Sequence, residues 1–170
     1  MSRKALFFDI DGTLLSEFDG GIPESAKEAL KEARRQGHLV FINSGRGYIL
    51  VKPVLKQIET DGVLCGCGTY IMIDGKAVYS YHVPYEKGIK LRQAIKEYRV
   101  EAVLEGVEGC YFNQEPYRIP EMERLRTSVN REMGCISLPL EDTSYEFDKF
   151  CITTDHISDA EGFFHAIEDD

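Results

Sequence analysis

The sequence predicts an α/β protein whose first part is built on a parallel β-sheet. Two short apolar runs, residues 5–10 and 39–42, have the composition of buried strands. A segment with apolar residues at helical spacing lies between them, and a third apolar run follows at 62–65. A strand, a helix and a second strand in this order form a right-handed unit with parallel strands. Ligands bind at the carboxyl ends of such strands, so the polar residues found there are the candidate site.

Turn and helix-cap residues predict where the other helices and strands of the first domain begin and end. Pro23 begins a helix with a small apolar stripe, and Gly37 ends it. The segment 48–58 predicts a second helix, which Pro53 kinks or restarts. Residues 69–81 have the alternation of a β-hairpin around an Asp-Gly turn.

The chain divides into two domains, residues 1–82 and 83–170, at a boundary near Pro84. The second domain is expected to be α+β, without an internal repeat. Its expected helices are 85–98, 120–133 and 158–167, and its expected strands are 100–104, 110–112 and 150–154.

Two carboxylates follow the first apolar run, in the segment Asp9-Ile10-Asp11-Gly12-Thr13. Residues two apart on a strand point the same way, so Asp9 and Asp11 are expected to face one small site. Two carboxylates at the end of a buried strand are costly unless a cation lies between them. Mg²⁺ is the natural candidate, because it takes oxygen ligands. The alternative is a simple turn, since Asp-Gly is a common turn pair.

The second apolar run ends in Ser44-Gly45-Arg46. Gly45 allows a ligand to approach the backbone closely, and the start of the following helix favours an anion. The alternative is a loop that only caps a helix. Arg46 has two possible partners, a substrate or a neighbouring carboxylate, and the sequence does not separate them.

Composition excludes several classes of partner. The net charge of −9 argues against nucleic acid, which needs a basic patch. No stretch approaches the roughly 20 apolar residues of a membrane span. The odd number of cysteines, without a secretory signal, indicates reduced thiols in the cytoplasm. The five are Cys65, Cys67, Cys110, Cys135 and Cys151.

With both motifs in place, the sequence resembles the haloacid dehalogenase superfamily of phosphohydrolases. Asp9, Asp11, Gly12 and Thr13 match its D-x-D-G-T motif residue for residue, and Ser44 matches its second motif. The resemblance implies a Rossmann-like core and a Mg²⁺-dependent phosphatase that acts on small phosphorylated metabolites such as sugar phosphates.

The resemblance also implies a role for each residue of the site. Asp9 is expected to attack phosphorus and form an aspartyl-phosphate, with Asp11 as the general acid and then the general base. The Asp9 carboxylate and the Asp11 backbone carbonyl are the expected metal ligands. Gly12, Ser44, Gly45 and Arg46 are expected to hold the phosphoryl oxygens.

The second domain resembles the large cap that the Cof-like branch of the family inserts into its core. Members of this branch often have Asn-Gly before the hairpin, where this sequence has Cys67-Gly68. The family's later Lys and its G-D-x-x-N-D stretch do not occur in the sequence. We therefore expect a truncated or fragmentary form whose first strand is an apolar edge, open to pairing with a partner chain.

Two further functions stay open at this point. One is a catalytically impaired relic that serves as a phosphate-binding or interaction module. The other is a phosphotransferase or mutase of the same superfamily, which shares the chemistry up to the aspartyl-phosphate.

Overall fold

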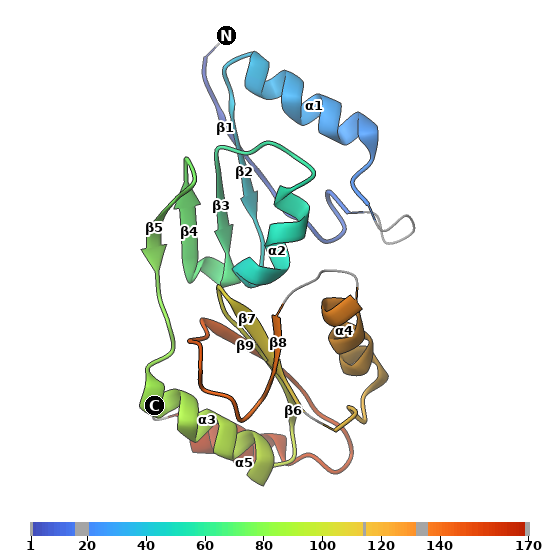
Figure 1. The fold of residues 1–170 in the computed structure, drawn as a ribbon, viewed down its shortest axis with the longest axis vertical. Coiled ribbons are helices and arrows are strands. Elements are labelled where there is room, and N and C mark those ends of the chain that lie inside the picture. The colour runs from blue at the N-terminus through green and yellow to red at the C-terminus, as the bar shows by residue number, and fades with distance from the viewer. Residues whose placement is uncertain (1, 16–20, 114, 132–135, 169–170) are drawn as a thin grey trace. The chain divides into compact units, whose positions relative to one another are not determined.

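The structure is a computed structural model that describes residues 2–15, 21–113, 115–131 and 136–168. The chain forms two compact units, Met1–Tyr81 and His82–Asp170, each with its own sheet and helices (Figure 1). The boundary expected from the sequence lies one residue later. The expected role of the second unit as a cap stays a prediction.

The first unit is built on a five-stranded sheet in the order β1-β2-β3-β4-β5. The first three strands run parallel, and β4 and β5 form an antiparallel hairpin beside β3. This arrangement confirms the α/β fold with a Rossmann-like parallel core. The strands are β1 (Ala5–Phe8), β2 (Leu39–Asn43), β3 (Gly62–Cys65), β4 (Tyr70–Ile73) and β5 (Lys76–Ser80).

The helices α1 (Glu24–Arg35) and α2 (Tyr48–Leu55) connect the parallel strands. The chain leaves α1 at Gly37, whose φ of +88° suits the left-handed conformation common after a helix. The second helix ends two residues after Pro53, so the expectation of a helix up to residue 58 is wrong. Proline lacks a backbone N–H and disfavours a helical residue before it, which weakens the end of this helix.

A bidentate ion pair joins α1 to the segment before β3. Asp61 accepts hydrogen bonds from Nε and Nη2 of Arg34, both at 3.2 Å. It also accepts the N–H of Val40 on β2 at 2.8 Å, while its own N–H donates to the Val40 carbonyl at 2.8 Å. Burial raises the pKa of Asp61, but the Val40 N–H and the Arg34 guanidinium outweigh burial and leave the pKa below its ordinary value of 3.8.

The second unit contains a four-stranded sheet in the order β8-β7-β6-β9. The parallel pair of β7 and β8 is the exception in an otherwise antiparallel sheet. Strand β8 was not expected from the sequence, and α3, α4 and β6 differ from expectation by only one or two residues at an end. The elements are α3 (Tyr85–Glu97), β6 (Glu101–Glu105), β7 (Gly109–Phe112), α4 (Pro120–Arg131), β8 (Ile136–Pro139), β9 (Lys149–Thr153) and α5 (Ala160–Glu168).

Helices α3 and α5 contact each other and pack on one face of this sheet (Figure 1). Alternation along β6 explains the packing, because Ala102 and Leu104 join the core while Glu101 and Glu105 point to the opposite face. The buried Glu101 carboxylate is satisfied by the backbone N–H groups of Arg118 and Ile119, at 2.5 and 2.9 Å.

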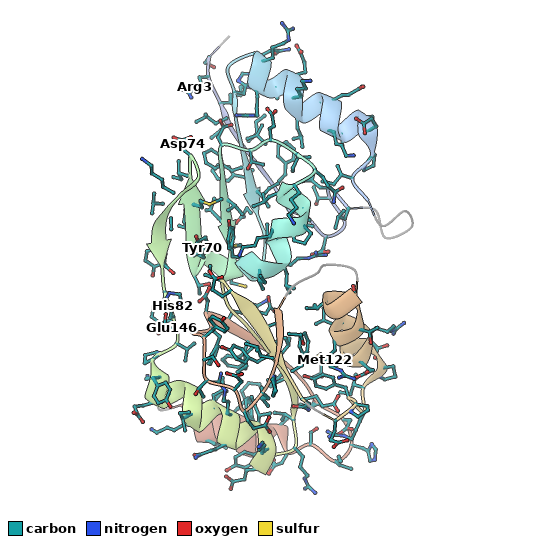
Figure 2. The ribbon with its side chains drawn as sticks, in the orientation of Figure 1. Arg3, Tyr70, Asp74, His82, Met122 and Glu146 are labelled. Carbon is teal, nitrogen blue, oxygen red and sulfur yellow. The ribbon has the colours of Figure 1, made fainter. Side chains whose placement is uncertain are left out.

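The first residues of the second unit are fixed to the segment before β9. His82 Nδ1 lies 2.6 Å from Oδ1 of the buried Asp148, and its Nε2 lies 3.5 Å from Glu146 (Figure 2). The N–H of Val83 donates to the Phe147 carbonyl at 2.9 Å. Burial raises the pKa of Asp148 despite the neighbouring imidazole.

Within the described ranges, no helix is long and apolar enough to cross a membrane.

Replacing Asp61 by Asn is expected to lower the free energy of unfolding by about 1–3 kcal/mol at neutral pH, since the Arg34 guanidinium loses its carboxylate. A depressed native pKa stabilises the fold above the unfolded pKa of 3.8, and this contribution is lost as the pH falls through the native pKa. Urea unfolding should therefore show a large difference between wild type and variant at about pH 7 and a small one at about pH 2. Asp74→Asn, at an exposed turn, is the matched control. An equal difference at both pH values would contradict this role for Asp61.

Candidate active site at the ends of the parallel strands

The two polar motifs lie at the same edge of the first unit's sheet. Strands β1 and β2 are paired in parallel, with Phe7 opposite Phe41 and Phe8 opposite Ile42. Asp9 therefore follows β1 at the level where β2 reaches its last residue, directly before Ser44. The carboxyl ends of parallel strands thus bring together two motifs that are 35 residues apart in the sequence.

A tight turn presents the two carboxylates. The carbonyl of the fully buried Ile10 accepts the N–H groups of Leu14 and Leu15, at 3.0 and 2.8 Å. Gly12 has a φ of +70°, a conformation that favours glycine. Asp9 and Asp11 are both exposed, and among the described residues the Asp9 carboxylate has no hydrogen-bond or ion-pair partner. The anchored backbone therefore leaves Asp9 open to a ligand.

Arg46 binds Asp11 in a bidentate ion pair. Its Nε and Nη2 donate to the two carboxylate oxygens of Asp11, at 2.9 and 2.5 Å. The structure thus shows the neighbouring-carboxylate partner, one of the two that the sequence left open for Arg46. The paired guanidinium offsets the charge of Asp11 and places a cation at the edge of the sheet where Asp9 lies.

Ser44 is buried, with 5% of its surface exposed, and begins the loop that leads to α2. Its N–H donates to the Leu64 carbonyl of β3 at 2.9 Å, and its Oγ accepts the N–H of Arg46 at 3.2 Å. The hydroxyl also has a proton to donate, which an oxyanion could accept. The observed hydrogen bond also fits the alternative of a loop-closing serine, so its role toward phosphate stays a prediction.

A second loop, which the sequence analysis did not assign to the site, supports the first. After β3, residues Gly66, Cys67 and Gly68 (the turn η1) have φ values of +61°, +57° and +94°. The Gly66 N–H donates to the Arg46 carbonyl at 2.7 Å, and the Cys67 thiol lies 3.8 Å from the Gly45 carbonyl. The available signal was the pair of glycines at the end of a third parallel strand.

The residues at this edge offer few ligands for a metal ion. The described part of the chain contains no group of three or more His, Cys, Asp or Glu side chains that could hold one. Mg²⁺ is commonly held by only one or two carboxylates together with water and phosphate oxygens, so the open Asp9 carboxylate fits such an ion. The Asp11 carboxylate is bound to Arg46 in this arrangement and is less available.

Comparison with known proteins adds a family to this geometry. A family model described as haloacid dehalogenase-like hydrolase matches residues 6–169. The chain is 40% identical over 96 residues to "Putative phosphatase YkrA" of Bacillus subtilis, an alignment that covers 55% of this chain and 37% of that protein. It is 27% identical over 114 residues to the pyridoxal phosphate phosphatase YbhA of Escherichia coli, covering 61% of this chain and 39% of YbhA.

Solved structures share the fold. A protein from Geobacillus kaustophilus matches with a TM-score of 0.71 and 25% identity, over 91% of this chain and 59% of that one. The sugar phosphatase BT4131 matches with a TM-score of 0.71 and 21% identity, over 98% of this chain and 64% of that one. The chain thus spans less than two thirds of the length of each of these relatives.

Replacing Gly66 by Ala is expected to destabilise the first unit by about 1–3 kcal/mol. A Cβ at this position would lie 2.2 Å from the Thr69 hydroxyl oxygen, and the positive φ adds backbone strain. Gly68→Ala is the matched control, because its φ is also positive but its Cβ would meet nothing within 4 Å. Urea unfolding should show a larger loss for Gly66→Ala, and equal losses would refute the close contact.

Proposed function

Because the chain belongs to the haloacid dehalogenase-like hydrolases, we propose that it is the nucleophile-bearing part of a phosphatase acting on phosphate monoesters. The observation that carries the proposal is the exposed Asp9 carboxylate, which has no partner in the described structure and follows a strand paired to the one before Ser44. A carboxylate held on a rigid strand end and left unpaired is suited to attack a bound phosphoryl group.

In the proposed reaction an Asp9 oxygen attacks phosphorus and displaces the alcohol oxygen of the substrate. Asp11 gives that oxygen a proton, so that the products are the free alcohol and an aspartyl-phosphate. Asp11 then takes a proton from water, which attacks phosphorus and releases inorganic phosphate. Proton transfer requires Asp11 to leave its ion pair, and the substrate's phosphate offers Arg46 a replacement anion.

The proposal places the phosphoryl oxygens against the loop 44–46 and the turn at Gly12. Ser44 would donate its hydroxyl hydrogen, and the backbone at Gly12 and Gly45 would approach closely because neither residue has a side chain. The loop is held on β3 through Ser44 and on η1 through Arg46, which supports a preorganised site.

We propose Mg²⁺ as the cofactor, with Asp9 as the side-chain ligand from this part of the chain. When bound, the ion neutralises charge on the phosphoryl group and on the carboxylate. The second proposed ligand from this part of the chain is the Asp11 backbone carbonyl, which the ion pair of the Asp11 carboxylate with Arg46 leaves available.

The substrate is proposed to be a small phosphorylated metabolite. YbhA is named for pyridoxal phosphate and BT4131 for sugar phosphates, so the family members similar to this chain act on different small phosphate esters. The second unit is proposed to be the cap that selects among such substrates. We also propose a cytoplasmic location, which the free thiols of Cys65, Cys67, Cys110 and Cys151 support.

The free edge of β1 is proposed to pair with a strand of a partner chain. Strand β1 is uniformly apolar, as strands buried on both faces are, yet it lies at the edge of the sheet. Phe7 is 56% exposed although its ring stacks on Phe41 at 5.0 Å. An exposed apolar edge of this kind is a template for another strand.

A phosphate-binding module without turnover is the second candidate. The observation that favours it is that the described residues include no group of three or more His, Cys, Asp or Glu side chains that could hold a metal ion. Binding of phosphate by the folded chain without Mg²⁺-dependent hydrolysis of a phosphate monoester would distinguish it from the enzyme.

Replacing Asp9 by Asn is expected to lower Mg²⁺-dependent hydrolysis of p-nitrophenyl phosphate by at least ~1000-fold, because an amide oxygen is a poor nucleophile. The fold should persist, since the Asp9 side chain is exposed and makes no contact in the described structure to lose. Asp74→Asn, which removes an exposed carboxylate in the turn between β4 and β5, serves as the control and should keep full activity. An active Asp9→Asn protein would refute the assignment of the nucleophile.

A further inference from the structure

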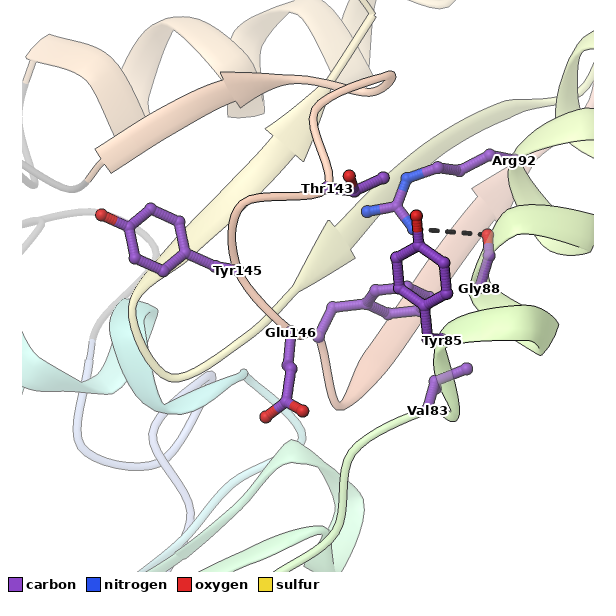
Figure 3. Close-up of a pocket in the computed structure, with 8 residues that line it drawn as sticks. Val83, Tyr85, Gly88, Arg92, Thr143, Tyr145 and Glu146 are labelled. Atoms are coloured by element: carbon purple, nitrogen blue, oxygen red, sulfur yellow. Dashed lines mark hydrogen bonds between the residues drawn. The ribbon is translucent and has the colours of Figure 1, made fainter.

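The second unit contains a small cavity beside the side chain of Arg92 (Figure 3). Its volume is about 70 Å³, several times the roughly 10–15 Å³ that one water molecule needs. The start of α3 forms one wall and the segment 143–147 forms the other. The residues that line it include Tyr85, Gly88, Arg92, Thr143, Glu146 and Phe147.

Arg92 is held in place by neutral groups. Its Nε donates to the Leu140 carbonyl at 2.7 Å, its Nη1 to the Gly88 carbonyl at 3.3 Å and its Nη2 to the Asp142 carbonyl at 3.1 Å. The guanidinium carbon lies 5.0 Å from the centre of the Tyr111 ring and 4.9 Å from that of Phe147. These contacts fix the orientation of the guanidinium, and they also fasten the segment after β8 to α3.

Arg92 forms no salt bridge with a carboxylate among the described residues, although the Asp142 carboxylate is close enough to act on its charge. The Asp142 carboxylate is occupied by the N–H and the hydroxyl of Ser144. Glu146 points away from the guanidinium in Figure 3 and lies 3.5 Å from His82 instead. Burial lowers the pKa of Arg92, and the charge of Asp142 only partly opposes this. A half-buried cation that forms no direct salt bridge is stabilised by an anion that reaches it.

The guanidinium has donors left for such an anion. Of its five N–H groups, three donate to carbonyls, which leaves one hydrogen on each terminal nitrogen without a partner in the described structure. Two N–H groups, one on each terminal nitrogen, can donate to the oxygens of an oxyanion. Tyr85 and Thr143 line the same cavity and carry hydroxyl groups.

Gly88 and the hydrogen bonds of Tyr111 maintain the space beside the Arg92 guanidinium. A Cβ on Gly88 would lie 3.2 Å from Nη1 of Arg92 and 3.0 Å from the Phe147 ring, so the glycine makes room for both. Tyr111 donates its hydroxyl to the Tyr145 carbonyl and accepts the Tyr145 N–H at 2.9 Å, which fixes the opposite wall. Because the guanidinium is already held in position, it can bind an anion in the cavity with little further loss of conformational entropy.

We propose that Arg92 and this cavity form a binding site for a small oxyanion, a phosphate or a carboxylate group. The site lies wholly within the second unit and is separate from Asp9 and Ser44 in the first. Arg92 provides two N–H groups to the anion, and the hydroxyl groups of Tyr85 and Thr143 provide further donors.

The test is an NMR titration of the full nitrogen-15-labelled chain with inorganic phosphate in one arm and acetate in the other. The Arg92 Nε–H signal and the amide signals of Gly88 and Thr143 are expected to shift saturably, with a Kd of about 1 mM or tighter for at least one anion. Saturation by phosphate alone identifies a tetrahedral ligand, and saturation by acetate alone identifies a carboxylate. No shift, or the same shift with sodium chloride, would overturn the proposal.

Variants separate this site from other anion binding. Thr143→Val and Tyr85→Phe leave the carbonyl bonds of Arg92 in place and should each weaken binding by roughly 3–10-fold. Gly88→Ala places a Cβ 3.2 Å from Nη1 of Arg92, so that the guanidinium has to shift slightly, and should weaken binding by roughly 3–10-fold. The matched control is Arg124→Gln, at an exposed arginine of α4, which should leave the Kd unchanged.

Arg92→Lys keeps the positive charge but loses the planar set of N–H donors. If the variant folds, it should bind the anion at least ~10-fold more weakly. The other three variants decide the matter if it does not fold, and an unchanged Kd in all three would overturn the proposal. Ser44→Ala should leave the titration of the Arg92 signals unaltered, because the proposed site lies wholly within the second unit. Phosphate that binds at the first unit is followed separately through the amide signals of Gly12 and Gly45.

Discussion

The parallel register of β1 and β2 is the constraint on which the candidate active site depends. It brings the residues after Phe8 and after Asn43 to one edge of the sheet, where a nucleophile candidate and an anion-binding loop meet and the ion pair of Arg46 with Asp11 joins them. The register in turn is held by the apolar pairing of the strands, with Ile42 and Val40 completely buried, while Asp61 connects α1 and β2 to the segment before β3. Stability and site geometry therefore share the same few contacts.

The charges at this edge are arranged locally rather than by the protein as a whole. The chain carries a net charge of −9, which disfavours an anionic ligand at long range. At short range Arg46 offsets Asp11, and buried loop contacts place Ser44 and its backbone neighbours at the end of β2. Arg92 in the second unit differs from Arg46, because its guanidinium contacts carbonyl oxygens and aromatic rings and forms no bidentate ion pair with a carboxylate.

The sequence correctly predicted the parts of the structure that depend on the pattern of neighbouring residues. The parallel core, the hairpin and the placement of Asp9 and Ser44 at strand ends follow from apolar runs and turn residues. The partner of Arg46 lies 35 residues away and was one of two choices, which only the folded chain decides. Strand β8 is four residues long and has no periodic signal of its own, because it depends on pairing with β7. The contacts of Arg92 lie up to 50 residues distant, and its helix predicts only an exposed charge.

The closeness of Gly88, Arg92 and Phe147 also bears on how relatives of this chain can differ from it. A side chain at position 88 has to take space from a guanidinium one helical turn later or from an aromatic ring on the facing segment. These three positions should therefore vary together, with larger residues at 88 accompanied by shorter ones at 92 or 147. Covariation of this kind would mark a packing unit that neither the candidate nucleophile nor its loops require.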